Sequence, residues 1–325
     1  MILAGDIGGT SARLALFDVH KERLVPVVER TYPSGQYKGL NEIVTTFSGS
    51  SGQKVRAACF GIAGPVQDGR VVTPNLAWVV DSRTLARDLH LPSVKLLNDL
   101  EANAYGIAAL EAQDFVTLNT GALGATGNAA VISVGTGLGE AGLFWNGKAH
   151  QPFACEGGHA DFAPRDELEA ELLLWLRAKY GHVSYERVLS GPGLLGIYEF
   201  LRDTGKGEES AELKEAIRRG DGPAAISATG LEGRHEWCVK ALDLFVSFYG
   251  AEAGNLALKT MATGGVFVGG SIAPRILQKL KTPAFMAAFT GKGRMKPLLE
   301  AMPVKVIMKD SAALLGAARF ATLSC

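Results

Sequence analysis

The fold is decided by the opening stretch of the chain, Met1-Ile-Leu-Ala-Gly-Asp-Ile-Gly-Gly-Thr10. An apolar run leads into paired glycines, and residues 13–16 continue as a second β-type run with no helix start between them. This pattern predicts a strand, a glycine turn and a second strand. Paired glycines let the backbone approach a phosphate and point N–H groups at it, so we interpret the unit as a nucleotide-phosphate hairpin. Thr10 adds a hydroxyl, and Asp6 adds a carboxylate suited to a magnesium ion.

Taken alone, two glycines in a β-rich stretch are most often a simple tight turn. The chain has no Gly-Lys-Ser/Thr, and no helix directly follows these glycines, so the usual phosphate motifs do not decide the question. A second copy does favour phosphate binding, because the layout recurs in Val131-Ile-Ser-Val-Gly-Thr-Gly-Leu-Gly-Glu-Ala-Gly-Leu-Phe-Trp145. The two hairpins lie about 125 residues apart and indicate two related half-molecules that face one nucleotide.

Composition limits the class of protein. A chain of 325 residues exceeds the usual size of a single core, so we expect two domains. The 33 basic and 33 acidic residues balance, which gives no electrostatic reason to expect a nucleic acid or an anionic membrane as partner. The four cysteines are widely spaced and contain no Cys-x-x-Cys pair, which favours a reducing compartment. With no leader-like start and no run that could span a bilayer, we expect a cytoplasmic protein.

Polar residues mark the ends of predicted elements. Asn98 and Asp99 follow a short apolar strand at residues 94–97 and precede a helix predicted over 100–110. Side chains at the carboxyl end of a buried strand lie where α/β folds place their ligands. Further on, residues 151–164 are predicted as a loop and 236–261 as a long helix interrupted at Gly250 and Gly254. A last helix over 311–321 is expected to return to the first domain, because chain ends often lie close together.

Six blocks of this sequence follow the order found in one family. They are Gly5-Asp-Ile-Gly-Gly-Thr10, Leu96-Leu-Asn-Asp-Leu-Glu-Ala102, Gly135-Thr-Gly-Leu-Gly139, Glu156-Gly-Gly-His-Ala-Asp-Phe-Ala-Pro164, Glu186-Arg-Val-Leu-Ser-Gly-Pro-Gly193 and Gly264-Gly-Val-Phe-Val-Gly-Gly-Ser-Ile-Ala-Pro-Arg275. The chain thereby resembles sugar kinases of the actin and hexokinase fold, and more narrowly the bacterial glucokinases. The resemblance implies an α/β, two-domain actin/hexokinase-like (ribonuclease H-like) fold with a cleft between the domains. Residues 1–110 plus 303–325 would form the small domain, and 111–302 the large one.

The resemblance implies a reaction: the γ-phosphoryl group of ATP is transferred to the 6-hydroxyl of glucose, with Mg²⁺. A sugar hydroxyl is a poor nucleophile, so a carboxylate base near the attacking oxygen accelerates the reaction by roughly 10²–10⁴-fold. Asp99 is the candidate base. Its alternative role is to cap the helix predicted to start at Leu100, and that role is compatible with catalysis.

The family's sugar contacts match Asn98, Asp99, Glu156, His159 and Glu186. Ordinary roles are open for some of them: His159 in a glycine-rich loop suits a surface histidine, and Glu186 suits the third residue of a helix start. Zinc binding is the more specific alternative role for His159, since related sugar kinases bind zinc at a comparable Gly-His that is followed by a cysteine cluster. No such cluster follows here, so we assign His159 to sugar.

The resemblance also implies the nucleotide contacts. The predicted set is Gly5, Asp6, Ile7, Gly8, Gly9 and Thr10 on one side of the phosphates, and Gly135, Thr136 and Gly137 on the other. Gly265 and the Gly269-Gly270 turn would leave room for the adenosine. Asp6 would reach Mg²⁺ through water. Two residues depart from the family pattern: Ser11 replaces a common Asn, and Glu140 replaces a common apolar residue. Alternation along the return strand would turn Glu140 away from phosphate; otherwise it would set a negative charge beside the nucleotide.

Competing functions remain open at this stage. A sugar-sensing regulator on the same fold would need a DNA-binding module, and only five residues precede Asp6. An actin-like filament or chaperone-type ATPase would not need the sugar-binding set and would hydrolyse ATP without glucose. A kinase for another hexose, or one that uses polyphosphate as donor, is the alternative within enzymes. The family also implies a homodimer.

Overall fold

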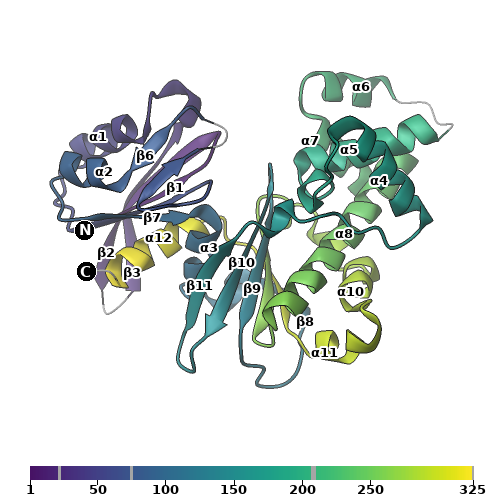
Figure 1. Cartoon of the computed structure of the whole chain (residues 1–325). Coiled ribbons are helices and arrows are strands. Elements are labelled where there is room, and N and C mark those ends of the chain that lie inside the picture. Colours follow the sequence, from purple (N-terminus) through teal and green to yellow (C-terminus); the bar gives the residue numbers. More distant parts are fainter. Residues whose placement is uncertain (21–22, 74–75, 206–209, 324–325) are drawn as a thin grey trace. The chain divides into compact units, whose positions relative to one another are not determined.

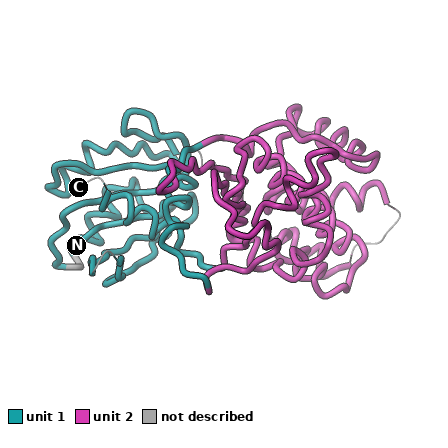
Figure 2. Tube along the Cα trace, turned by 90° about the horizontal axis from the view of Figure 1, so that it is seen from below, with its two compact units in different colours: residues 1–112, 151–154, 309–325 teal, residues 113–150, 155–308 magenta. Residues whose placement is uncertain are grey.

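The computed structural model describes residues 1–20, 23–73, 76–205 and 210–323. The chain forms two compact units (Figure 2). Unit 1 comprises Met1–Ala112, Gln151–Ala154 and Lys309–Cys325, and unit 2 comprises Gln113–His150 and Cys155–Met308. The last helix therefore belongs to the unit formed by the first 112 residues, which confirms its predicted return. The predicted division into domains at residues 110 and 302 stays a prediction.

Unit 1 is built on a five-stranded sheet in the order β3-β2-β1-β4-β7. Its strands are β1 (Ile2–Ile7), β2 (Ser11–His20), β3 (Arg23–Pro33), β4 (Ala57–Ile62) and β7 (Val94–Asn98). The first three are antiparallel, whereas β1, β4 and β7 run parallel to one another. Register places Ile7, Ile62 and Asn98 side by side, so three strands end at one edge of the sheet. Residues that follow these strands are thus brought together.

Helices cover both faces of this sheet (Figure 1). Helices α1 (Leu40–Ser51) and α2 (Ser82–Asp88) share one hydrophobic core with alternate residues of the strands, and α3 (Asp99–Ile107) and α12 (Ala312–Leu323) share the other. Alternate strand residues point to opposite faces, which is why β1 is buried along its length. A short hairpin of β5 (Arg70–Val72) and β6 (Val79–Asp81) and the 3₁₀ turn η1 (Ser34–Gln36) complete the unit.

The second sheet has six strands in the order β11-β10-β9-β12-β13-β8 and belongs to unit 2, except that Gln151–Ala154 of β11 are grouped with unit 1. The strands are β8 (Phe115–Asn119), β9 (Ala129–Val134), β10 (Leu138–Trp145), β11 (His150–Cys155), β12 (Gly265–Gly269) and β13 (Val304–Ile307). The helices are α4 (Glu167–Tyr180), α5 (Gly191–Thr204), α6 (Ala211–Arg218), α7 (Gly222–Leu231), α8 (Glu236–Thr260), α9 (Leu277–Leu280), α10 (Pro283–Thr290) and α11 (Lys296–Glu300). One large core joins α8 to the sheet and to its neighbouring helices.

Two local predictions for unit 2 were wrong. Helix α8 runs without interruption, because Gly250 and Gly254 serve packing: a Cβ at these positions would lie 2.1 Å from Phe285 O and 2.5 Å from Phe289 O of α10. The predicted loop at 151–164 contains β11 and the 3₁₀ turn η3 (Gly157–His159). No helix within the described ranges is long and apolar enough to cross a membrane.

Candidate functional site

The first glycine turn, between β1 and β2, is held in place by hydrogen bonds from the buried Ser34. The Gly8 N–H donates to Ser11 O (2.9 Å) and closes the turn between β1 and β2. Ser34, which is fully buried, donates from Oγ to Gly8 O (2.9 Å) and from its N–H to Thr10 O (3.0 Å). Gly9 lies partly exposed and Thr10 exposed, so the outer side of the turn is open to a ligand.

Asn98 and Asp99 form the start of α3. Asn98 is the cap: its Oδ1 accepts from the N–H groups of Leu100 (2.9 Å) and Glu101 (3.4 Å), and its Nδ2 donates to Gly64 O (3.1 Å). The helix begins at Asp99, one residue earlier than predicted, so the capping role considered for Asp99 belongs mainly to Asn98. Asp99 Oδ1 accepts from the next N–H, that of Leu100 (3.0 Å). Its half-buried carboxylate lies in the first turn, where the helix dipole favours negative charge.

Asp6 lies close to Asp99 at the same edge of the sheet. Asp6 pairs with Gly61 across the parallel strands, and a Cβ at Gly61 would lie 3.7 Å from the Cα of Asp99. Burial raises the pKa of Asp6 from 3.8 to about 6; the charges of Asp99 and Asp310 add to this rise, and Arg13 opposes it. Unit 1 therefore concentrates carboxylates beside the first glycine turn, an arrangement that suits a bound cation.

The raised pKa of Asp6 predicts a pH-dependent gain from Asp6→Asn in ligand-free protein. Between pH 3.8 and about 6 the folded state holds a proton that the unfolded state has released, so stability falls as pH rises through this window. Above it the deficit is constant and amounts to at most ~3 kcal/mol. We therefore expect Asp6→Asn to raise Tm at pH 7.5 in EDTA, and the gain to vanish near pH 4.

Asp310→Asn is the matched control, because this carboxylate is 87% exposed and should change Tm little. Thermal unfolding followed by circular dichroism measures both variants. An Asp6→Asn gain of equal size at pH 4 and 7.5 would contradict the assignment to the carboxyl's ionisation.

The second glycine turn, Gly135–Gly137, lies in unit 2 between β9 and β10. The Gly135 N–H donates to Gly137 O (2.9 Å), and Gly135 O accepts from the Gly191 N–H (2.8 Å) at the start of α5. Thr136 is exposed at the tip. Gly270, with φ of 87°, packs against the end of β9, where a Cβ would lie 2.2 Å from Val134 O. Only glycine fits there, because the conformation is left-handed and the contact is with backbone.

The predicted sugar-binding residues of unit 2 gather around the backbone of Leu138. Glu186, in the 3₁₀ turn η4 (Tyr185–Arg187), accepts from the Leu138 N–H with Oε2 (3.0 Å). Turn η3 packs against the carbonyl group of Leu138, since a Cβ at Gly158 would lie 2.2 Å from Leu138 O. The Tyr185 N–H donates to Ala160 O (2.9 Å) and ties the two turns together. Glu156 and His159 are both exposed at the ends of η3, so their polar groups are available to a ligand.

Three predicted nucleotide-binding residues, Gly5, Ile7 and Gly265, do not lie on the exposed side of either glycine turn. Gly265 begins β12 beside Ala129, whereas Gly269 pairs with Ser133, so Gly265 lies at the opposite end of the strand from the second turn. Gly5 is required by packing, because a Cβ would lie 2.5 Å from Phe60. The side chain of Ile7 is buried in the core, which leaves only its backbone for a ligand. Sequence blocks alone did not separate these packing positions from ligand positions.

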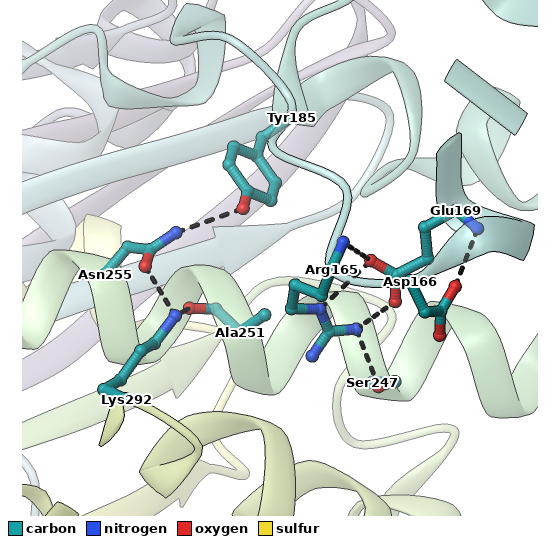
Figure 3. A network of polar contacts seen from close by, with 8 residues as sticks. All are labelled: Arg165, Asp166, Glu169, Tyr185, Ser247, Ala251, Asn255 and Lys292. Atoms are coloured by element: carbon teal, nitrogen blue, oxygen red, sulfur yellow. Dashed lines mark hydrogen bonds and ion pairs between the residues drawn. The ribbon is translucent and has the colours of Figure 1, made fainter. Parts of the chain in front are cut away.

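A polar network behind η4 was not found from the sequence (Figure 3). Asn255 of α8 donates to the hydroxyl of Tyr185 (3.1 Å), and Lys292 donates to Ala251 O (2.9 Å) and to Asn255. Arg165 binds the buried Glu169 and also donates to Ser247 of α8 (2.9 Å). These contacts fix η4 and the segment after η3 to the central helix. Their members are scattered over 128 residues, roughly 165 to 292, so no local pattern signals them.

Known proteins resemble this sequence along nearly its whole length. The family model described as Glucokinase matches residues 3–324. A glucokinase from Nostoc sp. (strain PCC 7120 / SAG 25.82 / UTEX 2576) is 41% identical over 334 residues, which cover 98% of each chain. The chain belongs to the glucokinase family. The predicted resemblance is thereby confirmed.

Solved structures agree with membership of the glucokinase family. The crystal structure of a glucokinase from an Antarctic psychrotroph has a TM-score of 0.84 at 32% identity and covers 99% of this chain and 98% of its own. A ROK family glucokinase from Streptomyces griseus, in complex with glucose and AMPPNP, has a TM-score of 0.66 at 22% identity, with 99% of each chain covered. The latter likeness concerns the fold alone. The predicted α/β, two-domain actin/hexokinase-like fold of a glucokinase-family enzyme is confirmed.

Proposed function

We propose that this glucokinase-family enzyme transfers the γ-phosphoryl group of ATP to the 6-hydroxyl of glucose, giving glucose 6-phosphate and ADP. The observation that carries the proposal is the carboxylate of Asp99 in the first turn of α3, beside Asp6 and next to the glycine turn of β1 and β2. A base and a phosphate-binding turn on one sheet edge are what phosphoryl transfer to a hydroxyl needs.

Asp99 would accept the proton of the 6-hydroxyl as that oxygen attacks phosphorus. Asn98 keeps one Nδ2–H beyond its bond to Gly64 O, enough to donate to a neighbouring sugar hydroxyl. Glu156, His159 and Glu186 would hold the remaining hydroxyls, and Glu186 would do so while bound to the Leu138 N–H. A sugar that lacks one of these hydroxyls would leave a polar group unpaired, which is the basis of selectivity.

For the nucleotide, we assign Gly8, Gly9 and Thr10 to one side of the phosphates and Gly135, Thr136 and Gly137 to the other. Backbone N–H groups in such turns bind anions without side-chain charge. The contact of Gly270 with the end of β9 supports the Gly269–Gly270 turn, rather than Gly265, as the place of the adenosine. A nucleotide there would lie at the same end of the sheet as the second turn.

The residues around Asp6 fit a magnesium ion held loosely. Among the described residues, no group of three or more His, Cys, Asp or Glu could hold a metal ion. Mg²⁺ keeps several waters and is commonly bound by one or two carboxylates plus substrate phosphates, so a complete protein cage is not needed. Asp6 is the proposed ligand, through water, and the nearby charges of Asp99 and Asp310, which add to the effect of burial in raising the pKa of Asp6, support a cation at this position. The ion would neutralise charge on the transferred phosphoryl group.

A coupled assay with a panel of acceptors and donors tests the function. Glucose, mannose, fructose and N-acetylglucosamine are each combined with ATP or polyphosphate, with and without Mg²⁺. We expect turnover with glucose, ATP and Mg²⁺. Preference for another hexose or for polyphosphate would identify the alternative kinase, and ATP hydrolysis without sugar would contradict the proposal. Light scattering tests the proposed homodimer, and cell fractionation tests the proposed cytoplasmic location.

A further inference from the structure

Two carboxyl groups are buried directly behind the turn that carries Glu156 and His159. Glu140 on β10 is 1% exposed, and Glu252 on α8 is fully buried. Among the described residues, Glu140 Oε1 has no hydrogen-bond partner, and Glu252 Oε1 has none beyond its ion pair with Lys259 Nζ at 3.5 Å. Buried polar atoms are nearly always satisfied, so two such oxygens in neighbouring side chains need an explanation. A proton shared by the two carboxyls satisfies both.

The charges around the pair favour one shared proton. Lys259 Nζ lies 3.5 Å from Glu252 Oε1, and Asn255 Nδ2 donates to Glu252 Oε2 (2.8 Å). The other titratable groups that interact with the pair are Cys155 from the β11–η3 segment, which interacts with Glu140, and Tyr185 from η4 and Lys292 from the segment after α10, which interact with Glu252. Burial, followed by the charge of Glu252, raises the pKa of Glu140 to about 8, and burial also raises that of Glu252. Two like charges in one buried site are strongly disfavoured.

The carboxyl of Glu140 also packs directly against the backbone of η3. A Cβ at Gly157 would lie 2.0 Å from Glu140 Oε2 and 2.9 Å from its Cδ, so backbone and carboxyl are in direct contact. Cys155 Sγ donates to Glu140 O (3.4 Å), which attaches the preceding residue to the same strand. Movement of the Glu140 side chain must therefore displace the turn between Glu156 and His159.

We propose that Glu140 is a positioning residue for the sugar: its neutral carboxyl, joined to Glu252 by a shared proton, sets the place of Glu156 and His159. The inference rests on the proposed sugar contacts of these two residues. At alkaline pH the shared proton passes to solvent, the two carboxylates repel each other, and η3 is displaced. Glucose then binds more weakly, whereas ATP binding is unaffected.

The test measures KM for glucose and for ATP, and glucose affinity by calorimetry, from pH 6.5 to 9.5. For the wild type we expect the glucose KM to rise about tenfold between pH 7 and 9, as expected for the loss of one proton with a pKa near 8. Glu140→Gln still donates to Glu252 but cannot ionise, so its glucose KM should stay within about threefold of the neutral wild-type value at every pH. Glu140→Ala should raise the glucose KM at all pH values. A normal glucose KM in Glu140→Gln would then show that position 140 needs a hydrogen-bonding side chain of this size and not a negative charge.

Cys155→Ala controls for thiol ionisation and should keep the alkaline rise, and thermal unfolding confirms that each variant is folded at the assay temperature. A wild-type glucose KM that is flat to pH 9.5, an alkaline rise that persists in Glu140→Gln, or an equal rise in the ATP KM would overturn the proposal. Absence of glucose turnover at pH 7 would instead refute the proposed function, so the two failures are distinguishable.

Discussion

Replacing Asp99 with asparagine is expected to lower kcat for glucose phosphorylation by roughly 10²–10⁴-fold while leaving the KM for ATP within about twofold. The substitution keeps the size of the side chain and its bond from the Leu100 N–H, but an amide oxygen cannot accept the hydroxyl proton. The loss should appear equally in kcat and kcat/KM, because the interaction is made only in the transition state. Steady-state kinetics with glucose and ATP varied separately measures both constants.

Glu101→Gln provides the matched control for Asp99→Asn. Glu101 is also an acidic residue in the first turn of α3 and is partly buried, so it shares the helix dipole and the local charge. We expect its kcat to stay within about threefold of wild type. If Asp99→Asn phosphorylates glucose at the wild-type rate, or if Glu101→Gln loses as much activity, then Asp99 is not the base and the effect is one of charge on the helix.

The two hairpins could be predicted from sequence because their signals are local. Gly8-Gly9 and Gly135-Thr136-Gly137 each lie between two apolar runs and specify a turn whatever the rest of the chain does. The start of α3 was predicted to within one residue for the same reason, since Asn98 is a strong capping residue after an apolar strand. Features that depend only on neighbours within about four residues could thus be predicted from the sequence alone.

Features that depend on distant partners were not accessible. Gly250 and Gly254 indicate helix breaks by propensity, yet tertiary contact with α10 overrides that preference and keeps α8 continuous. Gly265 and Gly270 look equivalent in sequence, and only strand register separates the end that faces the second turn. The support that Ser34 gives to the first turn spans 26 residues, so it too is visible only in the fold.

The contact between α3 and α12 explains how the end of the chain supports the part of unit 1 that carries the proposed base (Figure 1). The two helices meet backbone to backbone: a Cβ at Gly316 would lie 1.7 Å from Ala102 O, and one at Gly106 would lie 1.9 Å from Ala312 O. Small residues allow this approach, among them Ala102 on α3 and Ala313, Ala317 and Ala318 on α12. Because Asp99 begins α3, the depth at which α12 packs sets the position of the proposed base.

Gly316→Ala is therefore expected to destabilise the protein by about 3 kcal/mol, at the upper end for overpacking, because the atoms that collide belong to backbone and cannot rotate away. This corresponds to a fall in Tm of roughly 6–12 °C. At temperatures where the variant is folded, kcat should also fall, since α3 must shift to admit the methyl group. The matched control is Gly49→Ala in α1, where an added Cβ meets nothing within 4 Å and the helix should gain about 0.5–1 kcal/mol. Calorimetry and kinetics on both variants measure the two effects. A Gly316→Ala protein as stable and active as wild type would show that α12 can withdraw without moving the base, and that the close contact has no part in positioning Asp99.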